Sequence, residues 1–273
     1  WNYNPVFQQK PATIASLLVQ NKSLAAVCPE YLKTRWETIS ARLSAFHKSF
    51  TTAKVSLNVN CFYDIVPERF LLEYCEIKNQ ITKHVIDNNS IPANYEFLRE
   101  LSAFAYEIQQ NKLNIDYRSI ARDSHKLKVK NFIGKNKAAN PYVSYNIFGT
   151  KTGRLTTNKG FFPIMTLDSD YRKMVKPNND YFVELDYNAA ELRVLLALAG
   201  KEQPEDDIHQ WNAEAVYGGL VTREQAKKGI FSWLYNPRAK DALAERMYDR
   251  ELVLKRFWNG QHVVTPYRRL IPA

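Results

Sequence analysis

Residues 181–200 read YFVELDYNAAELRVLLALAG, and the hydrophobic period changes once within this stretch. In its first half polar and apolar side chains alternate, which is the pattern of a strand with one apolar face. From Asn188 onward the leucines recur at helical spacing, and Gly200 is typical of the residue that ends a helix. The stretch therefore predicts a strand followed directly by a helix, with the carboxylate of Asp186 at the end of the strand.

A carboxylate in that place suits a hard divalent cation. Mg²⁺ prefers oxygen ligands and usually takes one or two protein carboxylates together with the phosphates of a substrate. The alternative is that Asp186 caps the helix, while Glu191 and Arg193 are solvated surface residues. A short motif on its own favours this alternative, so the metal hypothesis depends on the sequence around it.

Composition limits the class of protein. The chain has 273 residues and a formal net charge of +10, which is compatible with a polyanionic partner. Its charged fraction of 24% is typical of a folded chain and argues against disorder. The three cysteines lack CxxC spacing and predict free, buried thiols in a reducing compartment. Because no apolar run approaches the roughly 18 residues of a membrane span, we expect a cytoplasmic protein that does not bind membranes.

Two regions before the charged middle of the chain read as helical. Apolar residues recur at helical spacing in residues 66–122, which predicts two helices joined by a turn at residues 88–92. We expect this pair to form a helical hairpin. Residues 14–19 and 31–46 are also expected to be helical, and nothing in residues 1–60 indicates catalytic chemistry.

Between residues 121 and 160 the charge is one-sided. One acid, Asp123, stands against nine basic residues, with aromatic residues and glycines among them. Such a segment is typical of a path for a nucleic-acid backbone, whereas a charge run alone favours a solvated loop. The basic residues are Arg122, Lys126, Lys128, Lys130, Lys135, Lys137, Lys151, Arg154 and Lys159.

Residues 222–236, TREQAKKGIFSWLYN, carry the most informative pattern. Thr222 and Gln225 have the spacing of a capping box, which predicts where a helix begins. Two cations, a ring and a phenol then recur every four residues and form one stripe along the helix, comprising Arg223, Lys227, Phe231 and Tyr235. That order matches a nucleoside triphosphate lying along the helix.

The alternative for this stretch is an amphipathic helix with a basic exposed edge. Gly229 costs such a helix about 1 kcal/mol relative to Ala, which indicates the close approach of another group or a hinge. Two further patterns are weak alone: Thr152-Gly153-Arg154 is compatible with an ordinary turn, and Asp207-Ile208-His209 with a structural histidine.

In this order and spacing the four patterns resemble family A DNA polymerases, the DNA polymerase I type, over about residues 66–273. Residues 186–193, DYNAAELR, are similar to motif A of that family, and residues 223–235 are similar to motif B, its mobile fingers helix. The turn at 152–154 is similar to the one that contacts the primer end. Residues 265–272, TPYRRLIP, are similar to the stretch that returns to the palm.

The resemblance implies template-directed DNA synthesis. The primer 3′-OH would attack the α-phosphorus of a dNTP and expel pyrophosphate. The partners would be primer–template DNA and dNTPs, and the cofactor would be Mg²⁺, with two ions in the complete enzyme. The short link between motif B and TPYRRLIP resembles compact, phage-encoded members, for which the location would be the host cytoplasm.

The resemblance also assigns roles to individual residues. Asp186 and Lys227 would be catalytic, and Asp186 with the carbonyl of Tyr187 would bind the metal. The residues that hold the nucleotide would be Arg223, Lys227, Phe231, Tyr235, His209 and Glu191. Of these, Glu191 would fill the space that a ribose 2′-OH needs. The residues that bind DNA would be Arg154, Thr152, Lys126, Lys128, Lys130 and Arg268.

One part of the family pattern is missing from the sequence. Motif C, which supplies a second metal-binding aspartate, should follow Pro272 by several tens of residues, and the sequence ends at Ala273. Two ions about 3.5–4 Å apart need more than one carboxylate. We therefore expect either a truncated chain or a second polypeptide that supplies this palm segment, and little polymerase activity from this chain alone.

The expected fold is mixed α/β, a right-hand polymerase with palm, fingers and thumb, mainly helical with an antiparallel palm sheet. Residues 1–140 would form an N-terminal helical and thumb-like region, 141–187 with 260–273 an incomplete palm, and 188–259 the fingers. The alternative function is a non-catalytic primer–template binding fragment, or a subunit of a split polymerase. A third reading, a general basic DNA- or RNA-binding protein, requires the stripe to be accidental.

Overall fold

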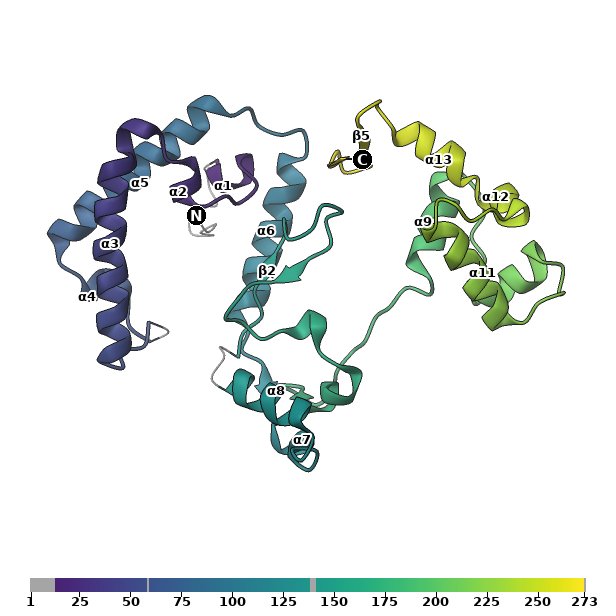
Figure 1. Cartoon of the computed structure of the whole chain (residues 1–273), viewed down its shortest axis with the longest axis horizontal. Coiled ribbons are helices and arrows are strands. Elements are labelled where there is room, and N and C mark those ends of the chain that lie inside the picture. Colours follow the sequence, from purple (N-terminus) through teal and green to yellow (C-terminus); the bar gives the residue numbers. More distant parts are fainter. Residues whose placement is uncertain (1–12, 58, 138–140, 273) are drawn as a thin grey trace. The chain divides into compact units, whose positions relative to one another are not determined.

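A computed structural model describes residues 13–57, 59–137 and 141–272 of the chain. The chain divides into two compact units, Trp1–Lys176 and Pro177–Ala273. Both are mainly helical and contain small two-stranded antiparallel sheets (Figure 1), which confirms the mixed and mostly helical class. The right-hand architecture and the three-part division predicted from the sequence stay predictions.

The first unit is built from short and long helices with two small sheets. Its helices are α1 (Ala15–Leu18), α2 (Leu24–Val27), α3 (Glu30–Thr52), α4 (Phe62–Ile65), α5 (Glu68–Asn88), α6 (Tyr95–Gln110), α7 (Arg118–Ala121) and α8 (Leu127–Lys137), with 3-10 helices η2 (Ile164–Thr166) and η3 (Ser169–Met174). Its strands are β1 (Asn114–Ile115), β2 (Tyr145–Asn146), β3 (Thr156–Thr157) and β4 (Val175–Lys176). Strand β1 pairs with β4, and β2 pairs with β3.

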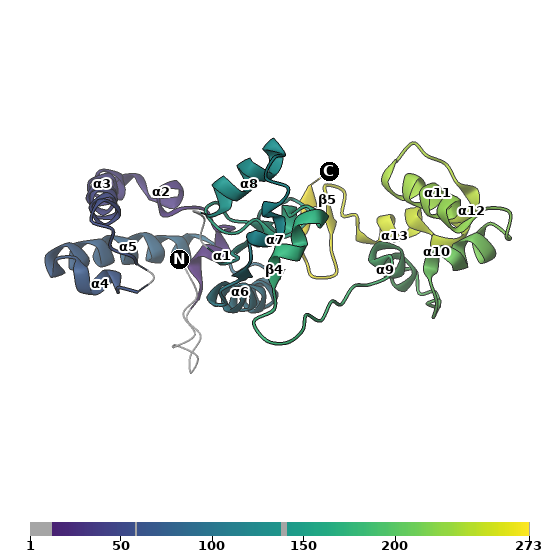
Figure 2. The same cartoon turned by 90° about the horizontal axis from the view of Figure 1, so that it is seen from below.

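Helices α3 and α5 pack against each other, as both views of the unit show (Figures 1 and 2). Their apolar residues recur every three or four positions, so that each helix has one face that is removed from water. Leu32 and Ile39 of α3 are buried together with Phe70, Ile77 and Ile81 of α5. The helical pattern predicted for both segments is confirmed.

Helix α6 buries its apolar residues elsewhere. Tyr95, Leu98 and Ala105 join Leu17 of α1 in a separate cluster, and the phenol of Tyr95 accepts a hydrogen bond from the amide of Ile14 at 2.8 Å. The expected hairpin of α5 and α6 is therefore wrong, because α5 directs its apolar face to α3 and α6 directs its own to α1.

Helix α8 is held by its apolar side, which leaves Lys128, Lys130 and Lys135 at the surface. Val129 is buried with residues of η2 and η3, and the rings of Phe132 and Tyr171 lie 5.1 Å apart. Lys128 forms an ion pair with Asp168 at 2.8 Å across the same contact. The charged segment is therefore partly an ordered helix, whereas a solvated loop was the alternative.

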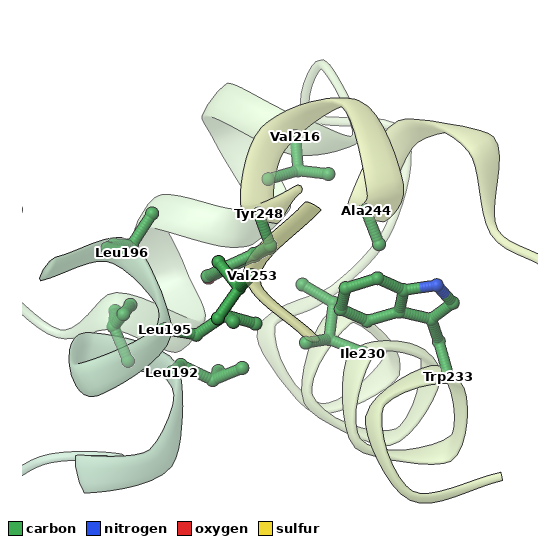
Figure 3. Close-up of a cluster of buried hydrophobic side chains, with 10 residues drawn as sticks. Leu192, Leu195, Leu196, Val216, Ile230, Trp233, Ala244, Tyr248 and Val253 are labelled. Carbon is green, nitrogen blue, oxygen red and sulfur yellow. The ribbon is translucent and has the colours of Figure 1, made fainter. Parts of the chain in front are cut away.

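The second unit consists of α9 (Ala190–Leu198), α10 (Ile208–Trp211), the π-helix η4 (Asn212–Val216), α11 (Arg223–Tyr235), α12 (Ala242–Tyr248), α13 (Arg250–Phe257) and the antiparallel strands β5 (His262–Val264) and β6 (Leu270–Pro272). Figure 3 shows its core, in which leucines of α9 and residues of α11, α12 and α13 point into one interior. Leu192, Leu196, Ile230, Trp233 and Tyr248 are at most 1% exposed.

The strand expected at residues 181–187 is not formed. These residues have no strand partner within the described part of the chain, and all of their side chains are exposed. Val183 is 82% exposed and Leu185 is 90% exposed. The alternation of the sequence is real, but a strand is stable only when its backbone groups pair with a neighbour. The helix that follows begins at Ala190, as α9, and Gly200 follows its end with φ of +69°.

The membrane-span and cysteine predictions concern the helices and the three thiols. None of the described helices combines the length and the apolar character that a bilayer-spanning segment needs. The three cysteines are free, as expected, although none is buried and Cys61 is exposed.

The hairpin of β2 and β3 gives a test of this packing. A Cβ atom built on Gly149 would lie 1.8 Å from Oγ1 of Thr156, so Gly149→Ala forces the hairpin to shift. We expect this variant to lower the free energy of unfolding by about 1–3 kcal/mol, measured by urea denaturation. Gly134→Ala is the control, because a Cβ there meets no atom within 4 Å in α8. It should stabilise the helix by about 0.5–1 kcal/mol, and equal effects of the two variants would contradict the packing.

Candidate nucleotide and nucleic-acid sites

Helix α11 begins where the capping box predicts. Oγ1 of Thr222 accepts from the amide of Gln225 at 3.3 Å, and Oε1 of Gln225 accepts from the amide of Thr222 at 2.9 Å. The helix buries Ala226, Ile230 and Trp233. Because the helix turns once in 3.6 residues, this burial leaves the stripe of cations and rings on another side of the helix.

The aromatic end of the stripe is bound to α9. The rings of Phe231 and Tyr235 stack with centroids 5.8 Å apart and an angle of 9° between their planes. The hydroxyl of Tyr235 donates to Oε1 of Glu191 at 3.0 Å. Tyr235 itself is 60% exposed, so this pair lies at the surface of the unit. The structure thus brings Glu191 to the stripe from 44 residues away in the sequence.

His209 lies beside the middle of the stripe. Its ring centroid is 5.6 Å from that of Phe231, and the residue is only 4% exposed. Within the described residues its Nδ1 atom is buried without a hydrogen-bond partner. Burial lowers the pKa of His209; the nearby carboxylate of Asp207 opposes this, and the cations of Lys227 and Arg223 add to it. The imidazole is therefore neutral at neutral pH.

Arg223 is already paired inside the protein. Its Nε and Nη2 atoms lie 2.7 and 2.6 Å from Oδ2 of Asp207, and a second carboxylate, Glu224, lies 2.5 Å from Nη1. The other oxygen of Asp207 accepts from the amide of His209 at 2.8 Å. Burial opposes ionisation of Asp207, but the hydrogen bonds from Arg223 and from the His209 amide outweigh it and lower the pKa of the carboxyl. One carboxylate therefore fixes both the arginine and the histidine.

Arg193 fixes the start of α9 relative to α10. Its guanidinium donates to the carbonyls of Asn188, Pro204 and Asp206 at 2.9, 2.7 and 2.9 Å. The side chain of Asn188 in turn accepts from the amide of Ile208 at 2.9 Å. Arg193 is thus a structural clamp rather than a solvated surface residue, and it holds the loop that leads to His209.

Gly229 lets another residue approach α11 closely. A Cβ atom at this position would lie 3.2 Å from the hydroxyl of Tyr217. That hydroxyl donates to Oδ2 of Asp241 at 2.5 Å, and Oδ1 of Asp241 caps the start of α12. Burial, followed by the hydrogen bond to Asp241, raises the pKa of Tyr217. Of the two explanations suggested by the sequence for Gly229, close approach therefore fits the structure.

The predicted metal ligands lie outside this contact network. Asp186 is exposed and Tyr187 is 78% exposed, both within the segment that forms no strand. Among the described residues, no three His, Cys, Asp or Glu side chains gather closely enough to hold a metal ion. Asp186 and the Tyr187 carbonyl could be protein ligands for one Mg²⁺ that is bound mainly by a triphosphate. They do not fit a two-ion centre, because two ions need more carboxylate charge.

A basic groove lies in the first unit. One wall is formed by α8, and the other by the β2–β3 hairpin and by residues 158–166, which follow the hairpin. Its volume is about 1210 Å³, and Arg154, which follows the turn of the hairpin, lies in its wall. The described lining contains cations and neutral side chains but no carboxylate. Its cations are Lys128, Lys135, Arg154 and Lys159, and its neutral residues include Asn131, Phe132, Thr156, Thr157, Asn158 and Phe161.

Four other residues predicted to bind DNA, Thr152, Lys126, Lys130 and Arg268, are not part of the groove lining. Thr152 is exposed in the hairpin turn, and Lys130 is exposed on α8. Lys126 precedes α8 and pairs with Asp123 at 3.1 Å. Arg268 is exposed with φ of +57° in the turn between β5 and β6, in the second unit.

The sequence does not single out three residues of these sites, Asp207, Lys135 and Lys159. Asp207 belongs to the pattern Asp207-Ile208-His209, in which only His209 is predicted to bind the nucleotide. Lys135 and Lys159 belonged to the basic segment, and nothing in a charge run separates residues that share a groove from those that do not.

Comparison of this chain with protein-family models, with curated proteins and with solved structures finds no match.

The buried imidazole gives a pH dependence of stability. Because the pKa of His209 is lower in the folded state than in the unfolded chain, folding favours the neutral ring. Its contribution to stability is complete above about pH 6.5 and is lost as the pH falls. Between about pH 7 and 5 we expect the wild type to lose more thermal stability than His209→Gln. His47→Gln, at an exposed position of α3, is the control and should follow the wild type. Parallel curves for all three proteins would refute the assignment.

Proposed function

We propose that this chain is the nucleotide- and DNA-binding body of a template-directed DNA polymerase. The observation that carries the proposal is the continuous row on the second unit, in which three separate segments contribute to one surface. Along it lie Glu191, Tyr235, Phe231, His209, Lys227 and Arg223. An amphipathic helix without a nucleotide site would account for the residues of α11. It would not account for the contacts of Glu191 and the buried His209 with that helix.

The aromatic end of the row suits the nucleoside. Phe231 is half-buried between His209 and Tyr235, so its ring is held in one orientation and offers a face to a base or sugar. The Glu191–Tyr235 hydrogen bond places a side chain beside that face. A ribose 2′-OH entering there would meet an occupied site, whereas a deoxyribose would not, which is a means of selecting dNTPs.

The basic end of the row suits the triphosphate. Lys227 is exposed and provides a point charge. Arg223 would exchange its contact with Asp207 for a phosphate, whose oxygens accept the same fork of donors. The neutral His209 can still donate one ring N–H to a phosphate oxygen. In the reaction the primer 3′-hydroxyl would lose its proton to water while its oxygen forms a bond to the α-phosphorus and the bond to the leaving pyrophosphate breaks. Lys227 would offset the charge that develops.

Mg²⁺ would travel with the triphosphate and would neutralise part of its charge, with Asp186 and the Tyr187 carbonyl as protein ligands. The carboxylates for a second ion would come from a further palm segment or from a second polypeptide. The exposed apolar residues of 181–187 favour such a partner, because a strand added beside them would cover them and pair their backbone. This observation also keeps the alternative function open, in which the chain binds primer–template DNA and a second chain completes the catalytic site.

The basic groove suits the backbone of the DNA. Lys135, Arg154 and Lys159 of its lining attract phosphates, whereas Lys128 is already paired with Asp168. The asparagines and threonines among them can donate hydrogen bonds to phosphate and sugar oxygens. Arg154 lies in the wall of this groove. We propose for it the position near the primer end that the resemblance implies.

Nucleotide binding tests the row on α11. In the presence of Mg²⁺ and primer–template DNA, we expect Lys227→Ala to weaken binding of a dNTP by roughly 10-fold or more, because a charge-assisted contact to phosphate is lost. Fluorescence titration of the full chain measures this without requiring turnover. Lys228→Ala is the matched control, since Lys228 is the next residue and is also exposed. Equal losses from the two variants, or no dNTP binding by the wild type, would refute the row as a nucleotide site.

DNA binding tests the groove separately. We expect Lys135→Ala to lower duplex affinity and to reduce the slope of log K against log salt by about 1, because one phosphate contact is removed. Lys48→Ala, which removes an exposed lysine of α3, should change neither quantity. Fluorescence anisotropy at several salt concentrations provides both values. An unchanged slope for Lys135→Ala would place the DNA elsewhere.

A further inference from the structure

A second cavity in the first unit differs in character from the basic groove. It has a volume of about 300 Å³, between α1, α6 and β2, which is the lower end of the range for small-molecule sites. Its described lining contains no charged side chain. The polar residues in it are Ser16, Asn21, Ser102, Tyr106, Gln109, Ser144, Tyr145, Asn146 and Asn158. A phosphate or a metal ion would find no counter-charge there, so the pocket favours a neutral ligand that forms hydrogen bonds.

Two amide side chains in this pocket, those of Gln109 and Asn158, each have one polar atom that is held by Ser144. Ser144, which is 5% exposed, donates to Oε1 of Gln109 at 2.8 Å and accepts from Nδ2 of Asn158 at 2.9 Å. Within the described residues no hydrogen bond engages the amide nitrogen of Gln109 or the amide oxygen of Asn158. The serine thus orients a donor group and an acceptor group in one wall. The edge of a nucleobase presents donors and acceptors side by side, and amide side chains are common partners for it.

The pocket also offers aromatic surface. The rings of Tyr106 and Tyr145 belong to its lining and are partly buried. Burial raises the pKa of Tyr145, so this phenol remains neutral. A planar base can stack on such a ring, which contributes about 1–3 kcal/mol per base in single-stranded complexes. Amides for the edge and phenols for the face are together the chemistry by which unpaired bases are held.

One residue connects this pocket to the basic groove. Asn158 lines both cavities, and it directly follows the strand β3. The groove on one side of it carries Lys128, Lys135, Arg154 and Lys159. A nucleic-acid strand whose phosphates follow those cations would therefore pass within one residue of the neutral pocket.

We propose that the pocket between α1, α6 and β2 binds an unpaired nucleobase of a strand whose phosphates lie in the basic groove. This inference rests on the proposed DNA-binding function and adds a base-binding site to it. The site is distinct from the row for the incoming nucleotide, because that row is in the second unit and carries cations for a triphosphate, whereas this pocket has none in its described lining.

The experiment uses the full chain and a duplex with a four-nucleotide single-stranded overhang, at either the 5′ or the 3′ end. In one set the overhang carries 2-aminopurine; in the other every overhang position is abasic. We expect the wild type to bind at least one base-containing overhang roughly 10-fold more tightly than its abasic counterpart and to quench its fluorescence. Equal affinity for the two overhangs, at both ends, would overturn the proposal.

Variants locate the effect. Gln109→Leu should remove most of the difference between base-containing and abasic overhangs, while Gln110→Leu, the next residue and exposed on α6, should preserve it. Thermal unfolding shows whether Gln109→Leu is folded, and Tyr106→Leu replaces it if it is not. Lys135→Ala should weaken both overhangs equally and keep their ratio. A ratio that survives both Gln109→Leu and Tyr106→Leu would refute the pocket.

Failure of the proposed function has a different outcome. In that case the wild type binds neither overhang, nor fully paired duplex DNA. The pocket is then tested alone with 2-aminopurine riboside. Fluorescence quenching by the wild type that is lost in Gln109→Leu would support a base-binding pocket without DNA, and the absence of quenching would refute it.

Discussion

Burial of one face of α11 is the constraint on which the second unit depends. A helix of 13 residues is marginal in water by itself, so its stability comes from packing. Ile230 and Trp233 are at most 1% exposed among the leucines of α9 (Figure 3), and each such side chain contributes about 1.5–3 kcal/mol on burial. With that face turned inward, helical geometry leaves Lys227, Phe231 and Tyr235 to form the row that we propose for nucleotide binding.

Asp207 couples the elements around that row. Its two oxygens hold the arginine of α11 and the backbone at His209, while Arg193 ties the preceding loop to the start of α9. Arg223 is consequently held in a defined position by an internal anion. If Arg223 binds a triphosphate, as we propose, one anion is exchanged for another and no mobile arginine has to be ordered first.

Much of the local structure could be predicted from the sequence. The capping box at Thr222 and Gln225 and the helical spacing of Leu192, Leu195 and Leu196 depend on near neighbours, and both patterns appear as expected. The prediction that α5 pairs with α6 was wrong, because the spacing of apolar residues indicates that a helix has an apolar face but not which element covers it. Spacing likewise does not show which cations share a surface: Lys128 and Lys135 line a groove with Arg154, while Lys126 is paired with Asp123 outside it.

The sequence by itself determined that α11 begins after Thr222, that α9 ends before Gly200 and that α11 carries cations, a ring and a phenol on one stripe. These properties arise from contacts within a few residues. Only the tertiary structure decided that Glu191 and His209 join that stripe, that Asn158 separates a charged groove from a neutral pocket, and that residues 181–187 form no strand within the described chain. The physical reason is the same in each case. Strand pairing, ion pairing and cavity walls need partners from distant parts of the chain, and alternation or charge in one segment does not specify those partners.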